Sequence, residues 1–157
     1  MKGESKIIDI LNQALADELT AISQYMVHSE MCANWNYTVL HEKIEQRAKD
    51  EMKHAESLIA RILFLESIPI VSKLNPMKIG KTVSEQLLND TDAEAQAIKN
   101  YQNFIKVCLE VGDAGSRELL EDILKDEEGH IDWLEAQQDQ INQMGVENYL
   151  TLQIGES

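Results

Sequence analysis

Two short motifs in the sequence pair a glutamate with a histidine three residues later. Glu51 and His54 form the first pair, and Glu127 and His130 form the second. Residues three apart lie on one face of a helix, so each motif directs a carboxylate and an imidazole the same way. One such pair is common as a surface ion pair. Two pairs in one chain are more specific, because carboxylate and imidazole together bind Fe(II) or Mn(II).

A further glutamate precedes each motif at the same interval: Glu18 stands before Glu51 as Glu94 stands before Glu127. The set also repeats along the chain at a single offset. Four pairs share this offset: Glu18 and Glu94, Glu51 and Glu127, His54 and His130, Tyr25 and Tyr101. This repeat predicts two related helical hairpins that face each other across a two-fold-like site.

Each of the four glutamates is embedded in a row of largely apolar residues that steps by three or four. The rows are Leu11, Leu15, Glu18, Ile22, Tyr25; Ile44, Ala48, Glu51, Ala55, Leu58; Leu87, Asp90, Glu94, Ala97, Tyr101; and Leu120, Leu124, Glu127, Ile131, Leu134. This spacing places every glutamate on the buried face of a helix. Four buried, unpaired carboxylates would each cost several kcal/mol, against a total stability of roughly 5 to 15 kcal/mol.

Two divalent cations would balance the four negative charges. We therefore predict a di-metal site for Fe(II) or Mn(II), since a structural zinc site favours thiolate and imidazole. Glu51 and Glu127 are the natural bridging ligands. The terminal ligands would be Glu18, Glu94, His54 and His130.

The positions of the prolines predict the helices that hold these residues. Proline interrupts helices, and both Pro69 and Pro76 fall in one short stretch, so the flanking segments can form long helices. We expect helices over residues 5–34, 38–66, 82–111, 114–144 and 146–154, in a single domain spanning residues 1–157. Thr82 and Glu85 have the spacing of a capping box, and Gly112 and Gly145 are typical helix ends. Residues 67–81 form a long connection. The predicted fold class is all-α: a four-helix bundle with one long crossover and a short fifth helix.

The composition narrows the class of partner. A formal charge of −14 opposes nucleic-acid binding, which needs clustered Lys and Arg. No apolar run approaches the roughly 18 to 20 residues of a membrane span, and no signal segment is recognisable, so we expect a cytoplasmic protein. Cys32 and Cys108 are far apart in the sequence, which favours two buried thiols over a disulfide.

Several segments together resemble the bacterioferritin family over essentially the whole chain. They are Met1-Lys2-Gly3, Asp50-Glu51-Met52-Lys53-His54-Ala55-Glu56, Arg61-Ile62-Leu63-Phe64-Leu65-Glu66, Asp126-Glu127-Glu128-Gly129-His130-Ile131-Asp132-Trp133-Leu134 and Asn148-Tyr149-Leu150. The resemblance implies a ferritin-like subunit with two Fe ions in a ferroxidase centre. It also implies a shell of 24 subunits built from dimers, which oxidises Fe(II) with dioxygen or peroxide and stores ferric mineral. A ferredoxin-type reductase would release the iron.

The resemblance further implies a b-type haem shared between two subunits, each of which supplies one methionine. Met52 matches that methionine. It follows Glu51 directly and is therefore rotated by about 100° around the helix, so its side chain should face out of the bundle. In the non-haem ferritins a methionine here would only pack in an interface, and that alternative remains open.

Some positions depart from the family pattern or admit two interpretations. Relatives with an accessory iron site carry a histidine near position 46 as the partner of Asp50; here the residue is Gln46. Tyr25 and Trp133 are candidate electron donors that more often simply pack. Gly129 suggests a close backbone approach beside the histidine that follows it. Two further histidines, His28 and His41, are expected to be packed or polar residues.

Two other function classes are compatible with parts of the pattern. A di-metal redox catalyst acting on a small molecule would need extra segments for a substrate pocket. A haem-carrier module would leave the six ligands unused. DNA-shielding miniferritins are disfavoured because their metal site spans two subunits. Particle size discriminates between the classes, since storage requires a large shell.

Overall fold

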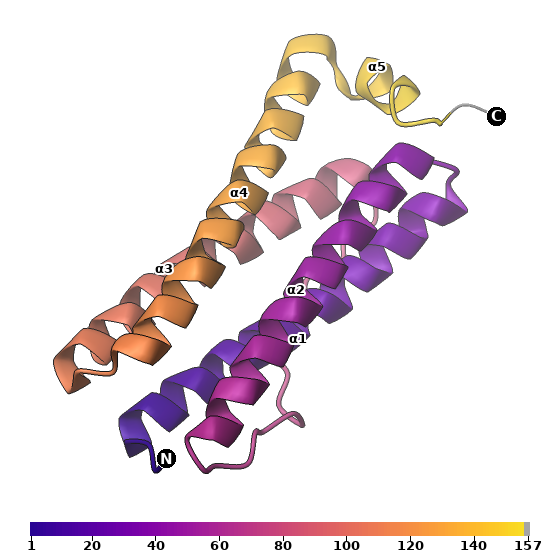
Figure 1. Cartoon of the computed structure of the whole chain (residues 1–157). Helices are drawn as coiled ribbons and strands as arrows, with labels where there is room; N and C mark the ends of the chain where they lie inside the picture. The colour runs from indigo at the N-terminus through magenta and orange to yellow at the C-terminus, as the bar shows by residue number, and fades with distance from the viewer. Residues whose placement is uncertain (156–157) are drawn as a thin grey trace.

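The computed structural model describes residues 1–155. It contains four long helices and one short helix (Figure 1). Their bounds are α1 Ser5–Asn34, α2 Thr38–Phe64, α3 Val83–Val111, α4 Ala114–Met144 and α5 Val146–Thr151. Within the described residues, no helix is both long and apolar enough to cross a membrane.

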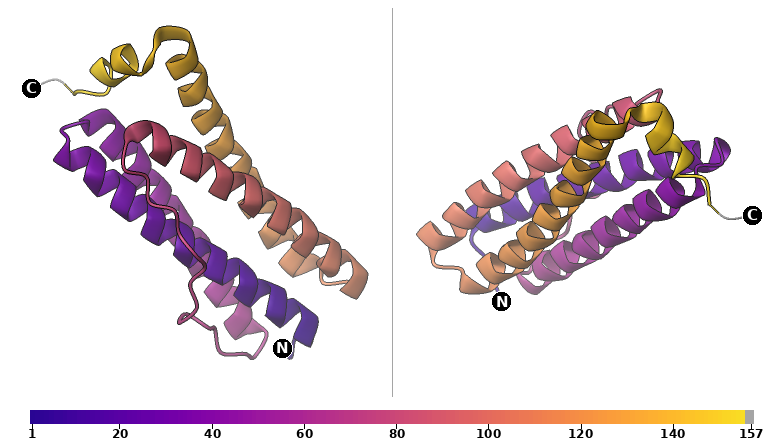
Figure 2. Two further views of the ribbon diagram at one scale, coloured as in Figure 1. Left: turned by 180° about the vertical axis from the view of Figure 1, so that it is seen from behind. Right: turned by 90° about the horizontal axis from the view of Figure 1, so that it is seen from above.

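The long helices form two antiparallel hairpins, α1 with α2 and α3 with α4, and the hairpins meet through α1 against α3 and α2 against α4. Between the hairpins, residues 65–82 (the crossover segment) return along the length of α1, so that α2 and α3 run parallel (Figure 2, left). The predicted four-helix bundle with one crossover and a short C-terminal helix is therefore confirmed.

Three helix ends differ slightly from the prediction. Helix α2 ends at Phe64 because the chain turns at Leu65 and Glu66, where φ of Glu66 is 61°. Helix α5 ends at Thr151, short of the predicted end at position 154. Helix α3 begins at Val83, with the preceding threonine as its N-cap.

The predicted capping box at the start of α3 forms only in part. The Thr82 hydroxyl accepts a hydrogen bond from the Glu85 backbone N–H at 3.2 Å, as expected. The Glu85 carboxylate, however, accepts from the backbone N–H of Lys81 at 2.8 Å, one residue earlier than the reciprocal bond of a capping box. This bond ties the end of the crossover segment to α3.

Hydrogen bonds from α1 side chains hold the crossover segment against the bundle. Four backbone N–H groups of the crossover donate to α1: Ile70 to Asn12, Asn75 to Thr20, Lys78 to Gln24 and Gly80 to His28. The last acceptor, His28, is fully buried, and its other ring nitrogen lies 2.9 Å from an Asp90 oxygen. The crossover therefore has a defined path over α1.

Two hydrophobic clusters fill the bundle. One is built around Leu11, Leu58 and Tyr101, and the other around Tyr25, Leu87 and Tyr149. Along each long helix, the inward glutamate stands between residues of the first cluster and residues of the second. The carboxylates therefore occupy a polar layer between two apolar cores.

Two smaller expectations have different outcomes. Both cysteines, Cys32 and Cys108, are free and buried, as predicted. The close approach suggested for Gly129 is wrong, because a Cβ built there would meet no atom within 4 Å. This glycine therefore faces open space and has no packing reason in the subunit.

Candidate metal centre

The structure brings all six predicted ligands together at mid-bundle. Helix α1 carries Glu18, α3 carries Glu94, and the two Glu-x-x-His motifs lie on α2 and α4. All six side chains are buried, with exposed fractions of 2% for Glu18, Glu51 and Glu94, 1% for Glu127, 6% for His54 and 3% for His130. The helical periodicity of the rows thus directs all six side chains into the bundle, as expected from the sequence.

The six residues divide into two groups of potential ligands. One group is Glu18, Glu51, His54 and Glu127, and the other is Glu51, Glu94, Glu127 and His130. Within each group, one candidate ligand atom per residue lies within 4.8 Å of all the others. Only Glu51 and Glu127 belong to both groups, which is the arrangement that bridging carboxylates require.

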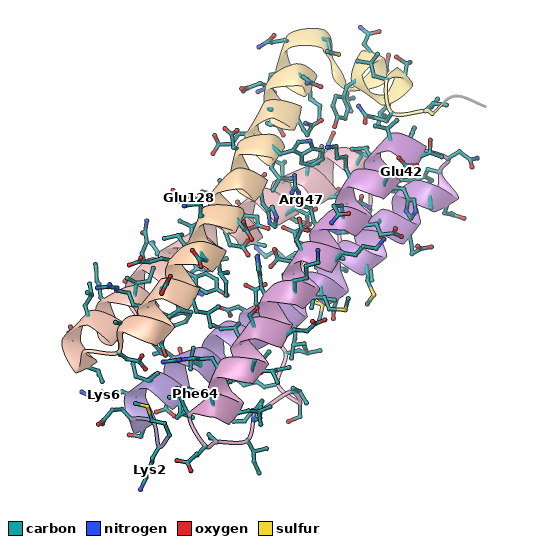
Figure 3. All side chains as sticks on the ribbon, viewed as in Figure 1. Lys2, Lys6, Glu42, Arg47, Phe64 and Glu128 are labelled. Carbon is teal, nitrogen blue, oxygen red and sulfur yellow. The ribbon has the colours of Figure 1, made fainter. Side chains whose placement is uncertain are left out.

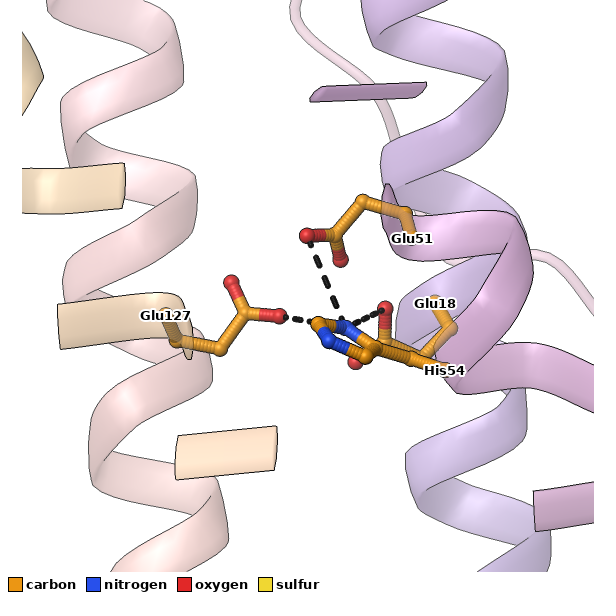
Figure 4. A group of neighbouring side chains, drawn as sticks. All are labelled: Glu18, Glu51, His54 and Glu127. Atoms are coloured by element: carbon orange, nitrogen blue, oxygen red, sulfur yellow. Dashed lines mark ion pairs between the residues drawn. The ribbon is translucent and has the colours of Figure 1, made fainter. Parts of the chain in front are cut away.

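The His54 imidazole points into the first group (Figure 4). Its Nδ1 lies 3.2 Å from Glu127 Oε1, 3.5 Å from Glu18 Oε2 and 3.8 Å from Glu51 Oε1. These carboxylates come from three different helices and surround a single nitrogen.

His130 has the matching place in the second group. Its Nδ1 lies 3.0 Å from Glu51 Oε1 and 3.5 Å from both Glu94 Oε1 and Glu127 Oε2. The His54 and His130 rings are 6.4 Å apart at an interplanar angle of 28°. The two half-sites therefore have similar geometry, as the repeat of the ligands along the chain predicted.

The other ring nitrogen of each histidine faces an aspartate that sequence reasoning did not assign. His54 Nε2 lies 2.7 Å from Asp126 Oδ2, and His130 Nε2 lies 3.3 Å from Asp50 Oδ2. Such carboxylates fix the orientation of metal-binding imidazoles. A signal was present in the sequence, since Asp50 and Asp126 are separated by the same offset as the ligand pairs and each precedes a motif glutamate.

Tyrosine hydroxyls connect the two hairpins at the same level. The Tyr25 hydroxyl donates a short hydrogen bond to Glu94, and the Tyr101 hydroxyl donates one to Glu18. Both bonds run between α1 and α3, and both tyrosines are buried. Each terminal carboxylate is therefore oriented by a tyrosine of the opposite hairpin.

Burial and crowding shift the pKa of the carboxyl groups in different directions. Burial is the main cause that raises the pKa of Glu18 well above its ordinary value, and the nearby charge of Glu51 adds to it. Burial likewise raises the pKa of Glu94, with the close Glu127 carboxylate as the next cause. Burial also acts to raise the pKa of Glu127, but the close Glu94 and His130 side chains outweigh it and lower that pKa.

The imidazoles respond to the same concentration of negative charge. Burial acts to lower the pKa of His130, but the close carboxylates of Glu127, Glu51 and Glu94 outweigh it and raise the pKa to about 12. The pKa of His54 is raised for the same reason, against the same effect of burial. Without metal, protons on the site therefore supply the positive charge that the carboxylates need.

A second observation, independent of these charges, indicates that the six residues fit divalent cations. Each of the six residues has a buried side-chain atom without a hydrogen-bond partner among the described residues: Glu18 Oε2, Glu51 Oε1, Glu94 Oε2, both carboxylate oxygens of Glu127, and Nδ1 of His54 and His130. Buried polar atoms are normally satisfied, so seven such atoms converging on one place indicate a missing ligand. Carboxylate oxygens with two imidazoles suit iron or manganese.

A cavity of about 160 Å³ opens beside the ligands between α1, α3 and the crossover segment. All four glutamates line it, together with residues of the three surrounding elements. Water occupies about 30 Å³ per molecule in the liquid, so this cavity has room for several waters or a hydrated ion. The carboxylates therefore border a space that can hold small solutes.

The remaining singled-out residues lie outside the six-ligand cluster. Met52 is 49% exposed on α2. Gln46 donates a hydrogen bond of 2.9 Å to Asp50, in place of the histidine of some relatives. The Arg47 guanidinium lies over the Trp133 ring, 5.5 Å from the ring centroid. Figure 3 shows Arg47 on the side of α2 that faces α4.

The comparisons with known proteins agree with this geometry. Residues 8–144 match the model of the ferritin-like domain. The chain is 42% identical to a bacterioferritin of Rhodobacter capsulatus, over 97% of this chain and 94% of the relative. It is also 42% identical to a bacterioferritin of Brucella melitensis, over 95% of this chain and 92% of that protein. The chain belongs to the bacterioferritin family.

The chain is also 42% identical to a bacterial ferritin of Synechocystis, over 98% of this chain and 99% of that protein. These relatives therefore match nearly the whole chain.

Proposed function

We propose that the protein stores iron and oxidises Fe(II) at an intra-subunit di-iron ferroxidase centre. The observation that carries this proposal is the convergence of seven buried, unpartnered ligand atoms from six residues. Membership of the bacterioferritin family supports iron as the metal. The ferric product would be deposited as mineral inside a shell of 24 subunits.

The residues would divide the work by position. Glu51 and Glu127, which belong to both ligand groups, would bridge two Fe(II) ions. Glu18 and His54 would complete one coordination sphere. The two equivalent residues on α3 and α4, Glu94 and His130, would complete the other. Because four carboxylates neutralise two divalent ions, binding leaves no net charge in the apolar interior.

Holding two Fe(II) ions close together matches the electron count of the reaction. Each bound ion would give up one electron to become Fe(III), and one dioxygen would accept both electrons with two protons to give hydrogen peroxide. Ion binding also displaces the protons that His54 and His130 retain in the metal-free chain. Asp126 and Asp50 face the outer Nε2 atoms of these rings, so their carboxylates would accept hydrogen bonds from the Nε2 protons that remain and would hold the rings in place.

Replacing a ligand tests the assignment directly. Glu18→Ala and His130→Ala are each expected to slow Fe(II) oxidation by at least about 100-fold, because losing even an outer-shell partner costs 10- to 100-fold. The measurement is stopped-flow absorbance of ferric product at two Fe(II) per subunit. Glu128→Gln is the matched control, since Glu128 is exposed beside Glu127. Native kinetics in the ligand variants would sink the assignment.

We further propose that Met52 binds a b-type haem at a dimer interface within the shell. Met52 fits this role because its thioether is on the outer face of α2, half exposed. A haem bound there would supply an electron-transfer group, and thioether ligation raises its potential. Electrons from a ferredoxin-type reductase could then reach the stored mineral, with the cytoplasm as the compartment.

An absorbance spectrum across a size-exclusion peak tests the haem and the shell together. A particle of roughly 24 subunits with a reduced low-spin haem spectrum is expected, and Met52→Ala should lose the haem bands but keep the particle. A large particle that takes up no haem would leave storage standing and exclude the haem role of Met52. A dimer would contradict the storage shell.

A further inference from the structure

Three residues form a wall between the ligand cavity and a second, outer pocket. The outer pocket has a volume of about 480 Å³ and lies over α1 and α3. Asp17, Asn75 and Asn100 line both spaces. They come from α1, the crossover segment and α3, so all three elements that frame the cavity meet at this wall.

The centre of the wall is the carboxylate of Asp17. Asn75 Nδ2 donates to Asp17 Oδ1 at 2.6 Å, and Asn100 Nδ2 donates to Asp17 Oδ2 at 3.0 Å. The Asn75 backbone N–H is in turn held by the Thr20 hydroxyl at 2.8 Å. Both carboxylate oxygens are therefore bound by side-chain amides, which a cation can displace more easily than it can displace another charge.

Asp17 also adjoins the centre along the chain, because the next residue is Glu18. Successive residues of a helix are rotated by about 100°, so Asp17 faces the crossover side while its neighbour faces the ligands. The only cationic side chain that lines the outer pocket, within the described residues, is Lys73. A divalent ion coming from this pocket therefore meets one carboxylate before it meets the four glutamates.

We propose that Asp17 is a transit ligand for divalent cations, a role that rests on the proposed function. Its carboxylate takes an ion from the outer pocket and passes it to the glutamates of the centre. Asn75 and Asn100 hold the carboxylate in place and close the wall when no ion is passing. No bond other than metal–ligand bonds is made or broken.

Co(II) binding by the whole protein tests this role without turnover. Stopped-flow visible absorbance would follow Co(II) entering the centre of the native protein and of Asp17→Asn, which removes the charge but keeps a hydrogen-bonding side chain. We expect association about tenfold slower in the variant, with an unchanged final stoichiometry, because a single charge on an access route steers cations. Added salt should slow the native protein more than the variant.

Two further variants distinguish a role of Asp17 in passing cations to the centre from a purely structural role. Asp9→Asn is the matched control, an exposed acid nearer the start of α1, and it should bind Co(II) at the native rate. Asn75→Ala removes the crossover contact but keeps the charge, so its association should be at least as fast as native. Slowing in Asn75→Ala equal to that in Asp17→Asn would overturn the proposal and leave only a structural brace.

The outcomes also distinguish this inference from the proposed function. A native rate in Asp17→Asn, with normal Co(II) stoichiometry, would overturn the role of Asp17 alone. If the native protein bound no Co(II) at the centre, both proposals would be overturned together.

Discussion

At the scale of single residues, the two tyrosines are the contacts most directly coupled to the ligands. Tyr25 donates to Glu94 and Tyr101 donates to Glu18, each from the opposite hairpin. Burial and the facing carboxylate raise the pKa of both phenols, so each remains a hydrogen-bond donor. Their first effect on the site is therefore to orient and stabilise the terminal carboxylates.

Tyr25→Phe is expected to lower the affinity of the centre for Co(II) about tenfold, because partners of metal ligands contribute 10- to 100-fold. It should reduce the free energy of unfolding of the metal-free protein by only about 1 kcal/mol. Titration calorimetry and urea denaturation measure the two effects. Tyr37→Phe, at the α1–α2 turn, is the control. Native affinity in Tyr25→Phe would show that the hydroxyl does not support the ligand.

The pKa shifts predict how pH affects the metal-free protein. The pKa values of Glu18, Glu94, His54 and His130 are all raised on folding. A raised pKa means that the folded state holds protons that the unfolded chain has released, so stability falls as pH rises. The loss begins near the unfolded carboxyl value of 4.5 and grows above the imidazole value of 6.5.

Thermal melts of the metal-free protein should therefore give a lower Tm at about pH 9 than at about pH 5. Saturating Co(II) should reverse this trend, because metal binding is favoured when the ligands are deprotonated. The Glu127 shift is opposite in sign but affects only the acid range below 4.5. A Tm that rises with pH in the metal-free protein would contradict the assigned proton uptake.

At the scale of elements, the crossover segment is fixed at its far end by buried polar groups. His28 is fully buried, accepts the Gly80 backbone N–H at 3.0 Å and faces Asp90 on α3. Asp90 also accepts from Gln24 at 2.9 Å. This network joins α1, the crossover segment and α3. Its hydrogen bonds are strengthened by the low dielectric constant of the interior.

His28→Leu is expected to lower the free energy of unfolding by about 2 to 4 kcal/mol, because it leaves the Gly80 N–H and one Asp90 contact unpaired in the interior. Urea denaturation measures the loss, and limited proteolysis should show earlier cleavage within residues 65–82. His41→Leu is the comparison, since His41 is only partly buried. Equal stability of the two variants would mean that the network does not hold the crossover.

Helix periodicity explains why the elements and the burial of the six clustered residues could be predicted from the sequence. A row that steps by three or four fixes both the helix and the inward direction of its glutamate, as in the row around Glu51. The contacts across the bundle were harder to predict from the sequence. The pairing of Tyr25 with Glu94, and of His28 with Gly80, depends on how two hairpins and a crossover dock, which no local pattern encodes.

At the scale of the whole molecule, the two-fold-like repeat is visible in the arrangement of both ligands and cores. Each hairpin contributes two buried glutamates and one histidine to the six-residue cluster. Neither hairpin has a complete coordination set alone. The constant offset between equivalent ligands recorded this symmetry in the sequence, but it carried no information on how subunits assemble.

The polar layer between the two apolar cores is a contact between the hairpins whose strength depends on bound cations. Without cations, the hairpins meet there through carboxylates that share protons; with cations, the same oxygens clamp both hairpins to common ions. The rate at which the bundle opens locally would then depend on how much iron is bound. Amide hydrogen exchange near Glu51 and Glu127 should slow when metal binds, so the exchange rate would report the metal occupancy of the subunit.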